Sequence, residues 1–332
     1  MLTKEQIQGY ASLDRLGVVY GKNGFAAGQI ALGAELYVAP RERSRLRLDM
    51  LDVQEDYYSR FKERLDLVLF YSKEKSDGLT ERRLKGKDSP FPFVREATKQ
   101  RPLEEAYQIG VFGDPSHPDF PDKGKYEIPS WSSTCFIRSG DSKRMSYQKF
   151  SLPVSDGNGG LHFDILRDCV LAWAKILRPA HGLAGLTLLQ ENSSLPGLYP
   201  TLQKYPGLDI QAALDFSMEA EGTHDRIKCV NWLTVLGEAL AEDLGGEFVL
   251  RNALEPECTL YTYPGGILIQ AGEAPRLADV AVPGNDELLA PYRKVAFITR
   301  RVRFMDYEDN LFRVEEPLNG AKEAKKWASR FD

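Results

Sequence analysis

The stretch IKCVNWLTVLGEALAEDLGG (227–246) is the most distinctive in the chain. It opens with a polar and aromatic cluster and stops on two glycines. Apolar residues recur at intervals of three and four, the spacing of one helix face, and glycine commonly follows the last turn of a helix. The pattern therefore predicts a core helix that ends at Gly245 or Gly246. Its apolar face would consist of Cys229, Leu233, Leu236, Leu240 and Leu244.

Asn231 and Trp232 raise the question of whether this stretch carries an active site. An indole fills a core, and a buried amide can satisfy backbone groups of an adjoining loop, so we interpret both residues as structural. Three acidic residues, Glu238, Glu242 and Asp243, would oppose the dipole at the end of the expected helix. This conflict favours basic partners nearby, inside the protein or outside it.

Outward from this stretch, strand-like and helical patterns are separated by polar connections rich in Gly and Pro. Strands occur in adjacent pairs as well as after helices, which predicts an α+β fold with a mixed, largely antiparallel sheet packed against several amphipathic helices. No long disordered linker divides the chain, so we expect one compact domain over 1–332, with lobes over about 1–155 and 156–332. The expected helices cover about 44–71, 102–112 and 161–177, and the expected strands cover 27–38, 131–139, 145–153, 182–190, 258–263, 266–272 and 294–304.

Composition places the chain among ordinary globular proteins. The formal net charge of -5 argues against a general nucleic-acid binder, which would be basic. The four cysteines lie far apart and are interpreted as reduced core thiols. The start, MLTKEQIQGY (1–10), lacks the basic and apolar regions of a signal peptide, and no stretch is long and apolar enough for a membrane span. A cytoplasmic location is expected, with no membrane partner and no nucleic-acid partner.

Catalytic signatures are absent from the sequence. There is no phosphate-binding glycine loop, no HExxH and no GxSxG. DGNGG (156–160) is interpreted as an ordinary turn. His181 is expected to form a hydrogen-bonding cap rather than to act as a base, and His224 to begin a capped helix. We predict no catalytic residue, no metal site and no cofactor.

Two charged clusters have open interpretations. MDYEDN (305–310) is either a solvated turn or an acidic patch that steers a basic partner. It lacks the Gly and Glu positions of an EF-hand loop. RERSRLRL (41–48) is interpreted as solvated surface in preference to a nucleic-acid groove.

Six segments in order carry a resemblance to a known family. Together they resemble the bacterial type VI secretion immunity family, formerly a domain of unknown function. The likeness is dense in the C-terminal half and is mainly one of layout in the N-terminal half. The segments are HGLAGLTLL (181–189), YPGLDI (205–210), IKCVNWLTVLGEALAEDLGG (227–246), GILIQAGEAPRLADV (266–280), PYRKVAF (291–297) and WASRFD (327–332).

The resemblance implies a non-catalytic protein that binds and neutralises a cognate type VI effector toxin, encoded by the adjacent gene. Because the chain is expected in the cytoplasm, the toxin would act there, which favours a nuclease. The alternatives are an enzyme that reverses toxin damage and an adaptor that loads effector cargo for secretion. The family segments are rich in fold-fixing residues, so we expect the toxin-binding surface on loops outside them. The candidate toxin-binding residues are Asp114, His117, Asp119, Asp122, Asp306, Tyr307, Glu308 and Asp309.

Overall fold

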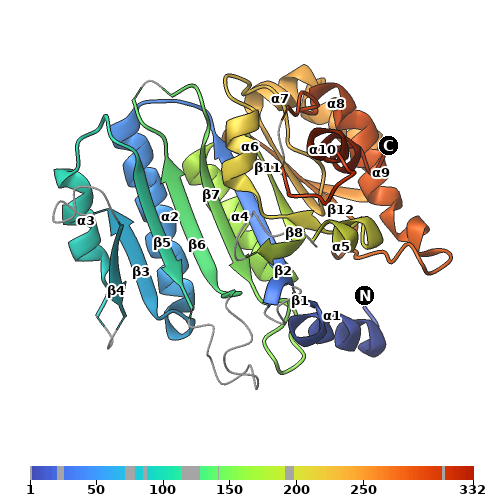
Figure 1. The fold of residues 1–332 in the computed structure, drawn as a ribbon. Helices are drawn as coiled ribbons and strands as arrows, with labels where there is room; N and C mark the ends of the chain where they lie inside the picture. Colours follow the sequence, from blue (N-terminus) through green and yellow to red (C-terminus); the bar gives the residue numbers. More distant parts are fainter. Residues whose placement is uncertain are drawn as a thin grey trace.

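One sheet runs through the molecule and takes strands from both halves of the chain (Figure 1). The computed structural model describes residues 2–20, 26–71, 79–84, 88–113, 128–140, 142–190, 198–308 and 311–332. The strands are β1 (Val18–Tyr20), β2 (Ala26–Val38), β3 (Leu67–Tyr71), β4 (Leu79–Arg83), β5 (Tyr107–Phe112), β6 (Ser132–Ile137), β7 (Ser146–Leu152), β8 (His181–Gln190), β9 (Asp209–Ile210), β10 (Leu233–Gly237), β11 (Cys258–Tyr263) and β12 (Gly266–Ala271).

The strand order is β11-β12-β10-β8-β2-β7-β6-β5-β3-β4, and every neighbouring pair on this path is antiparallel. β1 pairs antiparallel with β2, and the short β9 pairs parallel with β8. The predicted α+β class with a mixed, largely antiparallel sheet is confirmed.

The helices cover both faces of the sheet and its β11 end (Figure 1). They are α1 (Lys4–Leu16), α2 (Arg43–Phe61), α3 (Phe91–Gln100), α4 (Phe163–Leu177), α5 (Tyr199–Lys204), α6 (Ala213–Glu219), α7 (Glu238–Asp243), α8 (Gly246–Leu254), α9 (Ala290–Thr299) and α10 (Gly320–Ala328), with 3-10 turns η1 (Lys62–Arg64), η2 (Asn285–Leu289) and η3 (Arg300–Val302). α2 and α4 pack side by side on one face, and α6 lies on the opposite face over β7 and β2.

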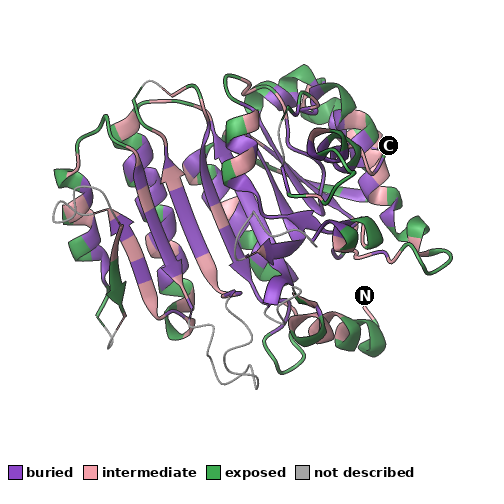
Figure 2. Ribbon diagram, viewed as in Figure 1, coloured by how far each residue is buried: buried purple, intermediate pink, exposed green. Residues whose placement is uncertain are grey.

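β2 connects the two halves of the chain, and its prediction as a strand is confirmed. It pairs with β7 from Leu32↔Leu152 to Val38↔Ser146 and with β8 from Gly28↔Gln190 to Tyr37↔His181. Because helices cover both faces, all of its residues are buried, as the purple centre of Figure 2 shows. Alternation along the strand places Glu35 and Tyr37 on the α6 face, where Tyr37 packs against Phe216.

The core under α2 and α4 is rich in aromatic side chains. Phe150 of β7 packs edge to face on Trp173 of α4, with ring centroids 4.4 Å apart, and Tyr57 of α2 contacts both. All three side chains are fully buried. Burial of each such ring contributes about 2–3 kcal/mol, and the edge-to-face geometry adds to it. The predicted strands over 131–139 and 145–153 and the predicted helix over 161–177 are confirmed as β6, β7 and α4.

The single helix predicted over 227–246 is wrong. Residues 227–232 are irregular, residues 233–237 form β10, and two short helices follow. β10 lies between β8 and β12, and all five of its residues are buried, so the strand is mostly apolar and shows no alternation of polar and apolar positions. In such a sequence, the spacing of the apolar residues does not distinguish a buried strand from a buried helix. The left-handed glycines at 245 and 246 are confirmed, with φ of 102° and 77°.

Three other predicted elements also differ from the structure. The helix expected over 44–71 ends at Phe61, and Leu67–Tyr71 is β3, where only Val68 and Phe70 are buried. The segment 102–112 contains β5 instead of a helix, because pairing with β3 and β6 outweighs local preference. The strand expected over 294–304 is mostly α9, whose buried residues Tyr292, Val295, Ala296 and Thr299 follow helical spacing.

Candidate functional site

The predicted toxin-binding residues fall into three groups. Asp114, His117, Asp119, Asp122 and Asp309 lie outside the described residues. Asp306 and Glu308 are exposed. Tyr307 is buried between them, and its hydroxyl donates to the Lys228 carbonyl over 3.4 Å. Its ring therefore belongs to the interior and not to the exposed face of the turn.

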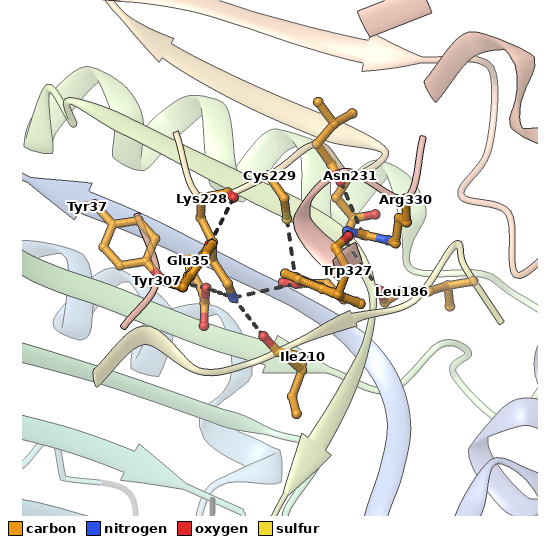
Figure 3. A network of polar contacts seen from close by, with 12 residues as sticks. Glu35, Tyr37, Leu186, Ile210, Lys228, Cys229, Asn231, Tyr307, Trp327 and Arg330 are labelled. Carbon is orange, nitrogen blue, oxygen red and sulfur yellow. Dashed lines mark hydrogen bonds and ion pairs between the residues drawn. The ribbon is translucent and has the colours of Figure 1, made fainter. Parts of the chain in front are cut away.

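A buried cluster of opposite charges surrounds Lys228 (Figure 3). The ammonium Nζ lies 2.7 Å from Glu35 Oε2 and 3.5 Å from Asp209 Oδ1. It also donates to the Ile210 carbonyl over 2.7 Å and lies 5.6 Å from the centre of the Trp327 ring. One cation thus faces two carboxylates, a carbonyl and an aromatic ring, which come from β2, β9 and α10.

Burial controls the ionisation of this cluster. It raises the pKa of Asp209 to about 6, although the Lys228 charge opposes the rise. Burial also disfavours the charge on Lys228, but Asp209 and Glu35 outweigh it and raise the Lys228 pKa above its ordinary value. The adjacent thiol of Cys229 has its pKa raised to about 11, first by burial and then by Asp209, so it is a poor nucleophile at neutral pH.

The cluster is closed to solvent. The Lys228 side chain is 0% exposed, and those of Glu35 and Asp209 are 2% and 5% exposed. No substrate can reach these groups in this conformation, which favours a structural role. The cluster ties the 227–232 segment to β2, β9 and α10, and Arg330 donates to the Val230 carbonyl to complete the contact.

Asn231 and Trp232 have the structural contacts expected of them. The Asn231 amide nitrogen donates to the Leu186 carbonyl over 3.4 Å, and its oxygen accepts from the Trp232 backbone NH over 2.7 Å. The indole NH donates to the Gly272 carbonyl over 3.1 Å, and the ring is buried. Both side chains therefore join the irregular 227–232 segment to the sheet.

The expected histidine caps are wrong. His181 is fully buried on β8 and stacks on Tyr37 with ring centres 4.6 Å apart, and neither ring nitrogen has a hydrogen-bond partner. Burial, followed by the Lys228 charge, lowers its pKa to about 3, so it is neutral. His224 lies in an irregular segment, where its Nε2 contacts the Lys143 carbonyl. No helix begins there; the chain continues as an irregular connection that pairs at Ile227 with the backbone of Val302 and Phe304.

A groove of about 1000 Å³ lies between α1, the end of α2 and the segments 129–131 and 153–165. Its wall combines aromatic side chains, including Phe61 and Trp131, with the guanidinium groups of Arg15 and Arg60. Asp14 fixes α1 at the groove, because its carboxylate accepts from the Val154 and Ser155 backbone NH groups over 2.6 and 2.8 Å. The lining of the groove carries charges of both signs.

Other expected features of the sequence also have a place in the structure. The DGNGG segment is a turn closed by Asp156, which accepts from two backbone NH groups, and these bonds lower the pKa of its carboxyl. All four cysteines are buried and unpaired. Across the described residues, no group of three or more His, Cys, Asp or Glu side chains is arranged to hold a metal ion. In the same part of the chain, no helix combines the length and the apolar character needed to cross a membrane.

Comparison with known proteins adds evidence independent of this geometry. Residues 53–331 match the family model TsiV, described as type VI immunity for VRR-NUC. Among solved structures, the fold is similar to that of T6SS protein PA0821 of Pseudomonas aeruginosa, with a TM-score of 0.75 and 20% sequence identity. That match covers 98% of this chain and 90% of the other, and it shows a shared fold. A search of curated proteins gave no match.

Proposed function

The chain belongs to the TsiV family of type VI immunity proteins for VRR-NUC, and from this premise we propose that it binds a cognate nuclease effector and neutralises it by stoichiometric occlusion. In this proposal the protein acts as one immunity-type domain over 1–332, in the cytoplasm, on a toxin encoded by the adjacent gene. The observation that carries the proposal is the family match over 53–331, which includes most of the sheet and the members of the Lys228 cluster other than Glu35.

The physical features of the chain support binding over catalysis. The groups with the most perturbed ionisation are sealed in the interior, where they hold segments of the fold together. The chain is acidic, whereas a nuclease must present positive charge to a polyanion. An acidic surface therefore attracts such an enzyme over long range and increases the association rate.

A titration of purified nuclease with this protein tests the proposal. We expect DNA cleavage to disappear at one molar equivalent, and the two chains to elute as one complex. Loss of cleavage products at a small fraction of an equivalent would instead identify an enzyme that reverses the damage. If the protein neither binds the nuclease nor protects cells that express it, stoichiometric neutralisation is wrong. A secretion defect without self-poisoning in the deletion strain would identify the adaptor alternative.

The exposed acidic turn remains a proposed part of the contact. Asp306 and Glu308 are the members of the predicted set that the structure places at the surface. The double variant Asp306→Asn/Glu308→Gln removes both charges with little change in shape. We expect it to weaken nuclease binding several-fold, and an unchanged affinity would remove this turn from the interface.

A further inference from the structure

The segment 238–257, which we name the acidic corner, contains α7 and α8 and concentrates the negative charge of the chain. It holds six acidic residues and one arginine, a formal charge of -5 that equals the net charge of the whole chain. The remaining residues are therefore neutral in sum. In Figure 1 the two helices lie together at the upper right, where α7 contacts β10 and β12 and α8 contacts β11.

Two carboxylates of the acidic corner are exposed and have no cationic neighbour. Glu238 and Glu242 make no ion pair with any described residue. The other four acidic residues are paired: Arg251 contacts Glu247 and Glu255, Arg301 contacts Asp243, and Lys294 contacts Glu257. The unpaired charge of the corner is thus located on α7.

Two apolar side chains project from the same corner into solvent. Phe248 is 76% exposed and Val249 is 48% exposed, whereas Leu250 and Leu254 of the same helix are fully buried. At 100° per residue, the exposed side chains occupy the side of α8 that faces away from the core. Exposed aromatic side chains are enriched at protein interfaces, and exposed apolar groups mark interaction sites.

Phe297 of α9 provides an internal comparison. It is 74% exposed, as much as Phe248, and α9 packs against α8. However, Arg293 and Arg301 lie four residues before and after it. Both arginines are ion-paired, Arg293 with Asp286 and Arg301 with Asp243. Phe297 therefore has no unpaired carboxylate on its own helix or four residues away, whereas the unpaired carboxylates of α7 lie on a helix that packs against the helix of Phe248.

We propose that the acidic corner docks a cationic surface of the cognate nuclease, with Phe248 as the apolar anchor and Glu238 and Glu242 as the charges that orient the partner. The inference rests on the proposed function, since that function supplies a partner with a cationic surface. It places the contact on α7, inside the family segment 227–246, and on α8, most of which follows that segment, whereas the sequence pattern alone indicates loops outside the family segments.

Binding of the nuclease to three variants tests the docking surface. Phe248→Ala and Glu238→Lys/Glu242→Lys should each raise Kd at least tenfold, and the charge reversal should also slow association. Phe297→Ala removes an equally exposed ring and should change Kd less than threefold. All four substituted side chains are exposed, so thermal unfolding should stay within a few degrees of wild type and show that the variants are folded.

The outcomes separate the inference from the function. If the wild type binds the nuclease and both corner variants bind within threefold of it, the docking surface is wrong and the proposed function stands. A wild type that does not bind overturns the proposed function itself. If Phe248→Ala converts a dimer into a monomer and leaves nuclease affinity unchanged, the corner joins two copies of this chain, and the inference is also wrong.

Discussion

At the scale of single residues, Lys228 is the most constrained charge in the described structure. Its ammonium is wholly buried and compensates two carboxylates that come from distant strands. Removing two carboxylates and an ammonium from water costs several kcal/mol per ion, and only good geometry offsets that cost. The cluster therefore specifies how the 227–232 segment joins β2 and β9, although its net contribution to stability is small.

Replacing Lys228 by Met should be strongly destabilising. The change keeps the volume of the side chain but leaves Glu35 and Asp209 buried without a cation, which costs about 3–5 kcal/mol. Urea unfolding measures the loss. Lys325→Met, at an exposed position on α10, should change stability by less than about 0.5 kcal/mol. The triple variant Lys228→Met/Glu35→Gln/Asp209→Asn should recover part of the loss, and a single-variant effect as small as the control would contradict the structural role.

His181 should make the fold sensitive to acid. Its pKa is lowered to about 3 from an ordinary value of 6.5, mainly by burial. Between these values the unfolded chain binds a proton that the folded chain does not, so stability falls as pH falls. From pH 7.5 to pH 5 this one group should cost about 2 kcal/mol. Urea unfolding at both pH values measures the free energy of unfolding of the wild type and of His181→Leu. Between pH 7.5 and pH 5 the variant should lose less of this free energy than the wild type, by that amount. Equal losses in the two proteins would refute the prediction.

At the scale of elements, the stretch 227–246 shows where periodicity fails. Leu233 and Leu236 are buried as predicted, but they lie on a strand and not on a helix. A strand covered on both faces and a buried helix both read as apolar runs, so pairing partners decide between them. Only the end of the stretch, from residue 238, is helical. There Leu240, Ala241 and Leu244 are buried, and Glu238 and Glu242 are exposed.

Gly245 should be required for the turn between α7 and α8. Its φ is 102°, and an added Cβ would meet Val249 side-chain atoms at 3.0–3.1 Å. Gly245→Ala should therefore lower the free energy of unfolding by about 2 kcal/mol or more. Gly284→Ala is the matched control, because its φ of 82° is similar but nothing lies within 4 Å. It should show only the backbone strain, about 1–2 kcal/mol. Equal losses in chemical denaturation would exclude the steric contribution at 245.

At the scale of the whole molecule, one sheet holds both halves of the chain. The formal charge of the acidic corner, -5, equals the net charge of the whole chain. Apart from the buried Lys228 cluster, many of the ion pairs elsewhere in the described structure have both side chains at least partly exposed, and such pairs contribute little to stability. The unequal distribution of charge matters instead for association, because a concentrated field steers an oppositely charged partner.

Association with the nuclease should therefore depend on ionic strength. Between about 50 and 300 mM salt the association rate should fall roughly tenfold, whereas the dissociation rate should change much less. Stopped-flow or surface-based kinetics gives both rates. Glu238→Lys/Glu242→Lys should flatten the dependence. A salt dependence that is identical in this variant would place the steering charge elsewhere on the chain.

The sequence by itself determined the α+β class, the strand at 27–38, the helix at 161–177 and the immunity family, because each depends on local pattern or on matched segments in order. Only the tertiary structure decided the identity of β10, β5 and α9, because strand pairing and burial on two faces override local periodicity. It also decided the position of Lys228. No spacing along the chain reveals that residue 228 lies beside residues 35 and 209, since only the folded chain brings the irregular 227–232 segment against β2 and β9.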